Sequence, residues 1–177
     1  MEIPVLATER LLLRGFAEDD LEAFAAIAAD PEVNRYLGGK PLDRAGAWRS
    51  IAFLLGHWQL RGYGSWALVE RASGRLVGRA GLHNPEGWPG LEVGWMVARD
   101  RWGQGLATEA GRAALDYAFG VLAADHVISV IDPANAASIR VAEKLGETFE
   151  RLTDLAIADH PVALYGIPRH RWRPTTT

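Results

Sequence analysis

The segment that most constrains this chain is a short polar loop, residues 101–108, which contains two glycines. An apolar run, residues 91–97, precedes it and predicts a β-strand, and a helical pattern begins near Leu106. A strand, a glycine-rich loop and a helix in this order direct backbone N–H groups and the helix dipole toward a phosphate. The order therefore predicts either a phosphate-binding loop or an ordinary loop at a helix start.

Two established phosphate-loop patterns do not match this segment. The Walker pattern requires a Lys after its last glycine, and no Lys follows here. The dinucleotide fingerprint shares Gly103 and Gly105, but Thr108 stands at its third glycine and the loop starts several residues beyond the strand. A third interpretation is a pyrophosphate cradle without Lys or Mg²⁺, in which main-chain N–H groups between Trp102 and Ala107 point inward.

The composition limits the class of protein. The 177 residues are 49% apolar and 23% charged, which predicts one globular domain over residues 1–177. A net charge of -3 provides no overall attraction to nucleic acid or to an anionic membrane. The absence of cysteine excludes thiol nucleophiles, and the scattered histidines predict no metal site. No signal peptide or bilayer-length apolar run is present, so a cytoplasmic protein is expected.

The hydrophobic periodicity predicts a mixed α/β fold. The order is one strand, two helices, three strands, a helix, a strand, a helix and two strands, which gives about seven mostly antiparallel strands and four helices. Asp30 and Pro31 are expected to end the first helix. In the second helix, the spacing of Trp48, Ile51, Leu55 and Trp58 predicts that both tryptophans pack in the core.

Residues 91–97 and 99–110 resemble the acetyl-CoA-binding motif of the GNAT superfamily of N-acetyltransferases. The family pattern is Gln/Arg-x-x-Gly-x-Gly/Ala, and Trp102 replaces its first residue in a form similar to the RimJ/RimL-type branch. Residues 8–14, 135–138 and 144–146 also resemble that branch, so nearly the whole chain is covered. Glu147 departs from the pattern, because the family usually has an aromatic residue there.

The resemblance implies a GNAT fold and direct attack of a primary amine on acetyl-CoA, without a covalent enzyme intermediate. It implies that a backbone N–H on the 91–97 strand, from Met96 or Val97, stabilises the acetyl oxygen. The residues that it implies for acetyl-CoA binding are Met96, Val97, Trp102, Gly103, Gln104, Gly105, Leu106, Ala107, Thr108, Asn135 and Ser138.

Three side chains are the candidates for acid–base chemistry. Glu92 lies in an apolar strand, where a carboxylate is costly unless it is solvated or paired, so it is either a base acting through water or a surface or ion-paired charge. The resemblance implies Ser138, as in RimL-type relatives, and Tyr165, as in many members of the superfamily, as the candidates to protonate the leaving sulfur. The alternatives are a solvated helix serine and a half-buried strand aromatic. Asn135 is either a cofactor contact or the N-cap of the next helix.

The sequence does not identify the amine that accepts the acetyl group. Trp88 lies in a Pro/Gly-rich turn and is a candidate substrate contact, whereas Arg79 and His83 are predicted to lie on a solvated face. A protein N-terminus, a polyamine, an amino acid and an aminoglycoside are all candidate acceptors. A non-catalytic acyl-CoA-binding module and an NAD(P)-dependent oxidoreductase are the alternative functions. Either a monomer or a homodimer is expected.

Overall fold

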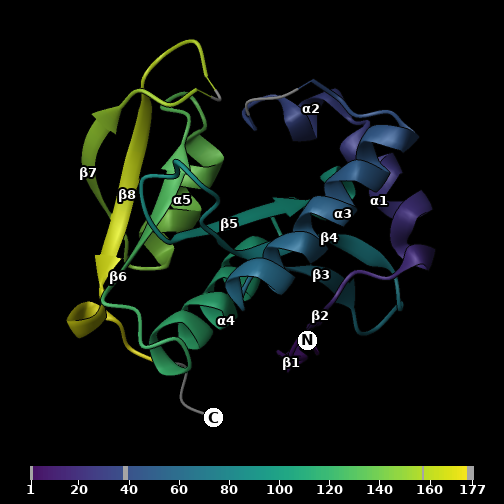
Figure 1. Cartoon of the computed structure of the whole chain (residues 1–177), viewed down its shortest axis with the longest axis horizontal. Helices are drawn as coiled ribbons and strands as arrows, with labels where there is room; N and C mark the ends of the chain where they lie inside the picture. The colour runs from purple at the N-terminus through teal and green to yellow at the C-terminus, as the bar shows by residue number, and fades with distance from the viewer. Residues whose placement is uncertain (1, 38–39, 157, 175–177) are drawn as a thin grey trace.

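The centre of the molecule is one eight-stranded sheet in the order β1-β2-β3-β4-β5-β6-β8-β7 (Figure 1). The computed structural model describes residues 2–37, 40–156 and 158–174. The strands are β1 (Leu6–Ala7), β2 (Leu11–Arg14), β3 (Ser65–Glu70), β4 (Leu76–His83), β5 (Glu92–Val97), β6 (His126–Ile131), β7 (Thr148–Thr153) and β8 (Val162–Pro168). The α-helices are α1 (Leu21–Ala28), α2 (Pro31–Asn34), α3 (Arg44–Arg61), α4 (Leu106–Gly120) and α5 (Ala136–Lys144).

The sheet is mixed, as the periodicity predicts. Neighbouring strands run antiparallel except β5 and β6, which are parallel and connected through α4. The described residues form eight strands and five α-helices, one more of each than the pattern indicates. The additional elements are β1, with two residues, and α2, with four. Elements this short contain too few residues to produce a periodic signal.

The Asp30–Pro31 pair ends α1, as expected, but it also starts α2. The Asp30 side chain accepts a hydrogen bond from the Glu32 N–H at 2.9 Å, and Pro31 occupies the first turn of the helix. Proline is favoured there because the first N–H groups of a helix have no acceptor within the helix. The same two residues therefore form a boundary between two helices rather than a simple break.

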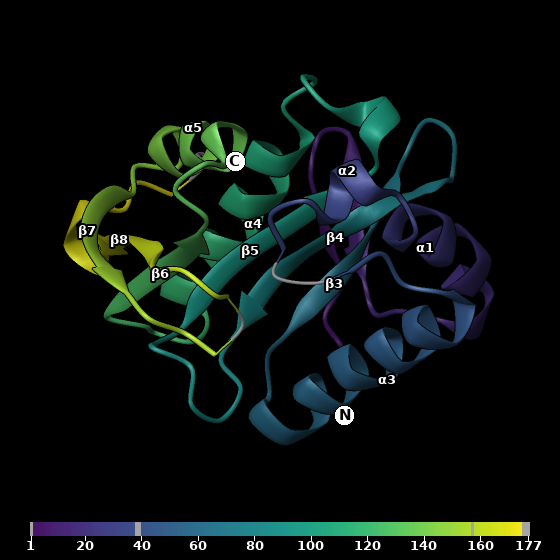
Figure 2. The same cartoon turned by 90° about the horizontal axis from the view of Figure 1, so that it is seen from above.

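The helices cover the sheet on both faces. Helix α1 packs against β4 and against α3 on one side, and α4 packs against β2, β4 and β5 on the other (Figure 2). One apolar cluster includes Leu11, Leu68 and Leu115 and joins the sheet to α4. A second includes Phe24 and Ile51 and joins the sheet to α1 and α3. In the part of the chain that the structure describes, no helix is both long and apolar enough to cross a bilayer.

The prediction for the two tryptophans of α3 is correct for Trp58 and wrong for Trp48. Trp58 is 1% exposed and its indole donates to the Ser65 carbonyl, whereas Trp48 is 49% exposed. The buried positions of α3 are Ala47, Ile51, Leu54, His57 and Trp58. Trp48 follows Ala47 by one residue, so it is rotated by about 100° away from that buried face.

Candidate active site

Strands β5 and β6 pair at one point and then separate. Within the described chain, Glu92 opposite Ile128 is the one residue pair in register. Beyond this pair, hydrogen bonds to side chains take the place of the backbone hydrogen bonds of a regular ladder. The Val130 N–H donates to Glu92 Oε1 at 3.2 Å, and Ser129 Oγ donates to the Val93 carbonyl at 2.8 Å. These bonds satisfy backbone groups that separation would leave unpaired. The two strands therefore diverge, and β6 lies at a steep angle to β5 (Figure 1).

A cavity of about 490 Å³ lies where the two strands diverge. Its sides come from β3–β5, from the α2–α3 region and from β6 and the start of α5. Glu92, Asn135 and Ser138 all line this cavity, although they belong to different elements. The cavity is also lined by Phe53, Arg79, Gly81, His83, Trp88, Gly94, Trp95 and Asp132.

Glu92 is half-buried, so it is not a fully exposed surface charge, and within the described chain it has no direct ion pair. Its Oε2 accepts the Trp88 indole N–H at 2.7 Å, and its Oε1 accepts the Val130 N–H at 3.2 Å. Burial raises the pKa of Glu92 to about 7, although both hydrogen bonds and the charge of Arg79 favour the carboxylate. Near neutral pH the group is therefore divided between its acid and base forms, which is the condition for proton transfer.

Ser138 lies on the first turn of α5 and accepts two hydrogen bonds. Asn135 Nδ2 donates to Ser138 Oγ at 3.0 Å, and the Trp95 indole N–H donates to it at 3.3 Å. A serine oxygen has two acceptor positions and one hydrogen. Because no described residue accepts that hydrogen, the Ser138 hydroxyl can donate to a molecule in the cavity.

Asn135 and Tyr165 have more structural roles. Asn135 caps α5, since its Oδ1 accepts the Ser138 N–H at 3.1 Å. Tyr165 lies on β8 with its ring 5.9 Å from that of Phe149 on β7, and it is not among the residues lining the cavity. The geometry therefore favours Ser138 over Tyr165 as a proton donor within the cavity.

The glycine loop has the backbone conformation that an anion site needs. Gly103 and Gly105 have φ of 74° and 80°, in the left-handed region that favours glycine. None of the amides of residues 103–108 donates to an acceptor in the described parts of the chain. The loop thus presents a run of unpaired N–H groups at the start of α4, including those of Gln104, Leu106 and Thr108.

Two residues that we did not single out from the sequence hold this loop in place. Arg10, before β2, donates to the Gln104 carbonyl at 2.7 Å and to the Glu109 carboxylate at 2.7 Å. Glu109 also accepts the Thr8 hydroxyl at 2.6 Å. Arg10 and Glu109 lie in two separate segments, 8–14 and 99–110, that both resemble the family. The presence of both segments in one chain was the signal that the sequence offered. Their ion pair connects the β1–β2 turn to the loop across 99 positions of sequence.

The backbone amides of β5 alternate between β4 and the gap. The Ala98 N–H donates to the Val77 carbonyl on β4, so the even-numbered residues, Met96 included, face β4. The Val93 carbonyl faces β6, and Val97 therefore directs its backbone toward the gap. Of the two predicted donors to an acetyl oxygen, the geometry favours Val97, because Met96 directs its amide into the β4 ladder.

Trp102 closes the far end of β5. Its indole N–H donates to the Val97 carbonyl at 2.8 Å, while 48% of the residue is exposed. The loop thereby packs back on the strand that leads to Glu92. The glycine loop, with its unpaired N–H groups, and the cavity beside Glu92 thus lie toward opposite ends of β5.

Comparison with known proteins decides the family. The family model described as an acetyltransferase (GNAT) domain matches residues 10–148. The chain belongs to the GNAT acetyltransferase family.

Individual relatives of this GNAT acetyltransferase cover almost its whole length. It is 34% identical over 169 residues to the uncharacterized protein YkkB of Bacillus subtilis, spanning 90% of this chain and 93% of that protein. It is 31% identical over 186 residues to the FsC-acetyl coenzyme A-N(2)-transacetylase of Aspergillus fumigatus, spanning 96% of this chain and 78% of that protein. The crystal structure of an acetyltransferase from Agrobacterium tumefaciens superposes with a TM-score of 0.84 at 31% identity, covering 94% of this chain and 95% of that one.

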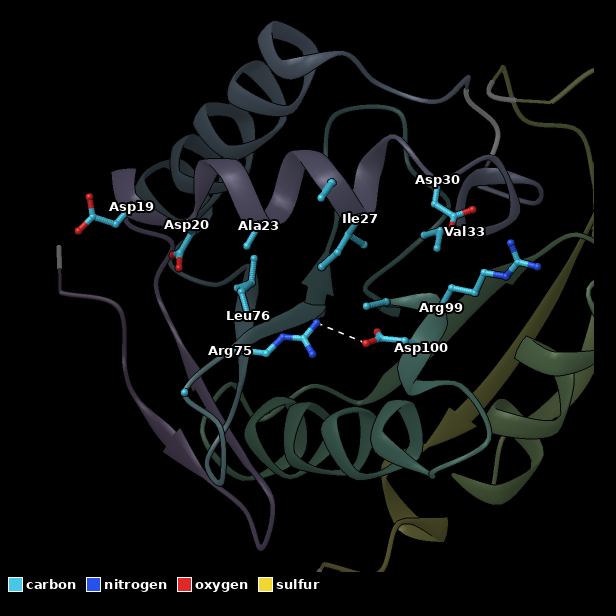
Figure 3. Close-up of a pocket in the computed structure, with 13 residues that line it drawn as sticks. Asp19, Asp20, Ala23, Ile27, Asp30, Val33, Arg75, Leu76, Arg99 and Asp100 are labelled. Atoms are coloured by element: carbon cyan, nitrogen blue, oxygen red, sulfur yellow. Dashed lines mark hydrogen bonds and ion pairs between the residues drawn. The ribbon is translucent and has the colours of Figure 1, made fainter.

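A second cavity of this acetyltransferase, about 830 Å³, lies beneath α1 beside the β3–β4 turn (Figure 3). Most of its carboxylates already have partners. Asp20 pairs with Arg14 at 2.7 Å, Asp30 caps α2, and Asp100 pairs with Arg75 at 3.3 Å across the cavity in Figure 3. Three of the four carboxylates that line this cavity are therefore held in structural contacts.

The departure from the family pattern at Glu147 places a carboxyl group in the protein interior. Glu147 is 2% exposed, its Oε1 lies 3.1 Å from Ser129 Oγ, and its Oε2 has no partner among the described residues. The Ser129 hydroxyl has one hydrogen, for which the Val93 carbonyl and Glu147 Oε1 are both within reach as acceptors. Burial raises the pKa of Glu147 well above its usual value, and the nearby charges of Glu92 and Glu150 raise it further.

Glu147→Gln is expected to weaken the pH dependence of stability. The folded state holds a proton on Glu147 that the unfolded chain releases, so wild-type stability falls as pH rises from about 4.5 toward the raised pKa. The glutamine side-chain oxygen can accept from Ser129 and does not titrate, so the variant should lose less free energy of unfolding between pH 5 and pH 8. Urea unfolding across this range measures the difference. Glu143→Gln, on the exposed side of α5, should keep the wild-type slope, and an equal slope in Glu147→Gln would refute a buried acid.

Proposed function

We propose that this enzyme transfers the acetyl group of acetyl-CoA to a primary amine by direct attack. The observation that carries the proposal is the arrangement along β5, with unpaired loop amides after one end and Glu92 and Ser138 beside the other. The name of the Aspergillus fumigatus relative gives acetyl coenzyme A as its acetyl donor, which supports the same donor here. The proposal treats residues 1–177 as a single cytoplasmic domain, either monomeric or homodimeric.

The donor site would use the backbone. The amides of residues 103–108 and the dipole of α4 would hold the pyrophosphate, which needs no Lys. The gap beyond Glu92 gives the thioester arm access to the odd-numbered backbone groups of β5, and the Val97 N–H is the candidate donor to the acetyl oxygen. These groups fit the donor because they are unpaired or face the gap in the folded chain.

The chemistry would divide between two side chains. The amine nitrogen attacks the thioester carbonyl, and Glu92 takes the amine proton through a water molecule. As the carbon–sulfur bond breaks, Ser138 donates its hydroxyl hydrogen to the departing sulfur and regains a proton from solvent. Because the pKa of Glu92 is about 7, the base form is available at neutral pH.

Ligand-dependent melting followed by thiol release tests the proposal. Acetyl-CoA and CoA should raise the melting temperature and NAD(P) should not, with about 2.7 kcal/mol of stabilisation expected at a hundredfold excess over Kd. Free thiol should then appear with at least one class of amine in a panel of peptides, polyamines, amino acids and aminoglycosides. CoA binding without thiol release from any amine would support a non-catalytic acyl-CoA module. Stabilisation by NAD(P) alone would support an oxidoreductase.

A further inference from the structure

The charged groups that line the β5–β6 cavity are unequally partnered. Glu92 accepts two hydrogen bonds, as described above. Asp132 accepts the Ala134 N–H at 2.7 Å and contacts His160 at 3.0 Å. Arg79 has no hydrogen bond or ion pair with any described residue, and its Nε is buried. The Glu92 charge acts on Arg79 from a distance, but within the described chain no acceptor contacts the guanidinium directly.

This arrangement corrects the prediction that Arg79 and His83 lie on a solvated face. Both line the cavity, because alternate residues of β4 share one side of the sheet and this side lies under the α2–α3 region. Other arginines without a side-chain partner in the described ranges are exposed, so water serves them: Arg49, Arg99, Arg140, Arg151 and Arg171. Arg79 is different, since it is half-buried, its Nε is shielded from water and its guanidinium stays charged.

The floor of the cavity between Arg79 and Glu92 carries no side chains. Gly81 on β4 lies directly opposite Gly94 on β5. A Cβ on Gly94 would lie 3.7 Å from Glu92 Oε1, so a side chain there would occupy the space beside the carboxylate. Gly94 thus leaves open the space beside the candidate base, whereas a Cβ on Gly81 would meet the Gly64 carbonyl at 2.5 Å.

Aromatic rings form an uncharged wall at the Glu92 end. The His83 ring lies 5.8 Å from Phe53, 5.1 Å from Trp88 and 5.4 Å from His57, on which it stacks. Burial lowers the pKa of His83 to about 4, so this ring is neutral at physiological pH. Such a wall suits an apolar or planar body more than a strongly hydrated one.

We propose that the acceptor is an amine that also carries a carboxylate, as an amino acid does, with the carboxylate held by Arg79. This inference rests on the proposed acetyl transfer and narrows its acceptor. The planar guanidinium binds a carboxylate through two parallel hydrogen bonds, which supplies the missing counter-charge. The amine lies over the bare glycine floor toward Glu92, and the apolar body packs on the aromatic wall.

The charges of the cavity disfavour the other acceptor classes. A polyamine or aminoglycoside would bring several positive charges beside an unpaired Arg79, while the cavity carboxylates already have partners. A dianionic phosphate would meet one guanidinium and a nearby Glu92 charge. A single carboxylate brings one negative charge to Arg79 and so meets less repulsion from Glu92 than a dianion does.

Matched pairs of amines test the proposal. Thiol release from acetyl-CoA would be measured with L-phenylalanine against phenethylamine and with 6-aminohexanoate against pentylamine, since each pair differs in the carboxylate. Wild type should prefer the carboxylated member of at least one pair by roughly 10- to 150-fold in kcat/KM, the range for a charged hydrogen bond. Arg79→Met should remove most of that preference through KM, and Arg79→Lys should retain part of it. Arg171→Met, an exposed arginine, should keep the wild-type preference.

Melting curves separate ligand binding from a structural role. Without ligand, Arg79→Met should still unfold cooperatively, so that its melting temperature can be compared with that of wild type. With CoA present, L-phenylalanine or 6-aminohexanoate should stabilise wild type and not the variant. A lower melting temperature of Arg79→Met together with equal loss of both members of each pair would overturn the proposal, and so would turnover of amines without a carboxylate preference. Absence of thiol release or CoA binding would instead contradict the acetyl transfer itself.

Discussion

Glu92→Gln is expected to lower kcat by about 10²- to 10⁴-fold, the usual contribution of a general base. Wild-type turnover should rise with pH up to about 7 and then level, because burial raises the pKa of Glu92 to about 7 and the deprotonated form is the active one. The variant should lack this inflection. Thiol release with saturating acceptor and acetyl-CoA between pH 5.5 and 9 measures both effects.

Two controls make the Glu92 result specific. Glu92→Gln should still be stabilised by CoA, since the loop amides lie at the other end of β5. Glu22→Gln changes an exposed carboxylate that pairs with Arg44 at 2.7 Å, and it should keep the wild-type rate and pH profile. A Glu92→Gln enzyme with the wild-type profile would remove this residue as the base, and Ser138 would then be the remaining acid–base candidate in the cavity.

Gly105→Val is expected to abolish stabilisation by CoA, with affinity weakened by about 100-fold or more through lost charge-assisted hydrogen bonds. Gly105 has φ of 80°, and a β-branched residue there would move the loop to another backbone conformation. The amides of residues 103–108 would then no longer point to one place. The fold should persist, because a Cβ at Gly105 meets Arg10 at 3.6 Å, an ordinary contact. Ligand-dependent melting and direct titration with CoA measure the loss.

Gly74→Val is the matched control. Gly74 has φ of 67° at the β3–β4 turn, and a Cβ there would meet no heavy atom within 4 Å. Both variants therefore carry a similar backbone cost of roughly 1–2 kcal/mol for the left-handed conformation. Gly74→Val should lose stability and keep its CoA response. If Gly105→Val also kept the full CoA response, the glycine loop would not be the pyrophosphate site.

Local patterns predicted the long elements well and the short ones poorly. The alternation of β5, the loop and α4 is visible in the sequence because apolar spacing and paired glycines act over neighbouring residues. Strand β1 and helix α2 were missed, since two and four residues carry no period. Trp48 was assigned to the core because a spacing of three or four residues does not by itself show where the buried face is centred.

The same difference between local patterns and long-range contacts applies to the candidate site. The sequence singled out Glu92 and Ser138 as residue types suited to proton transfer, and the fold places both in one cavity. The sequence could not show that Arg79 lines that cavity without a direct partner. A charged residue that alternates with apolar residues in a strand is normally predicted to face solvent. The ion pair of Arg10 with Glu109 was missed for a similar reason, since its members are far apart in sequence.

By itself, the sequence determined the order of the longer strands and helices and the two glycines that permit the loop conformation, since each depends on a few adjacent residues. Only the tertiary structure decided where β5 and β6 separate and which side chains face the resulting space. That outcome depends on strand register, which pairs residues distant in sequence. Register places Gly81 opposite Gly94 and sets Glu92 at the point where β5 and β6 separate. It also leaves the Arg79 side chain without a direct hydrogen bond or ion pair in the described chain.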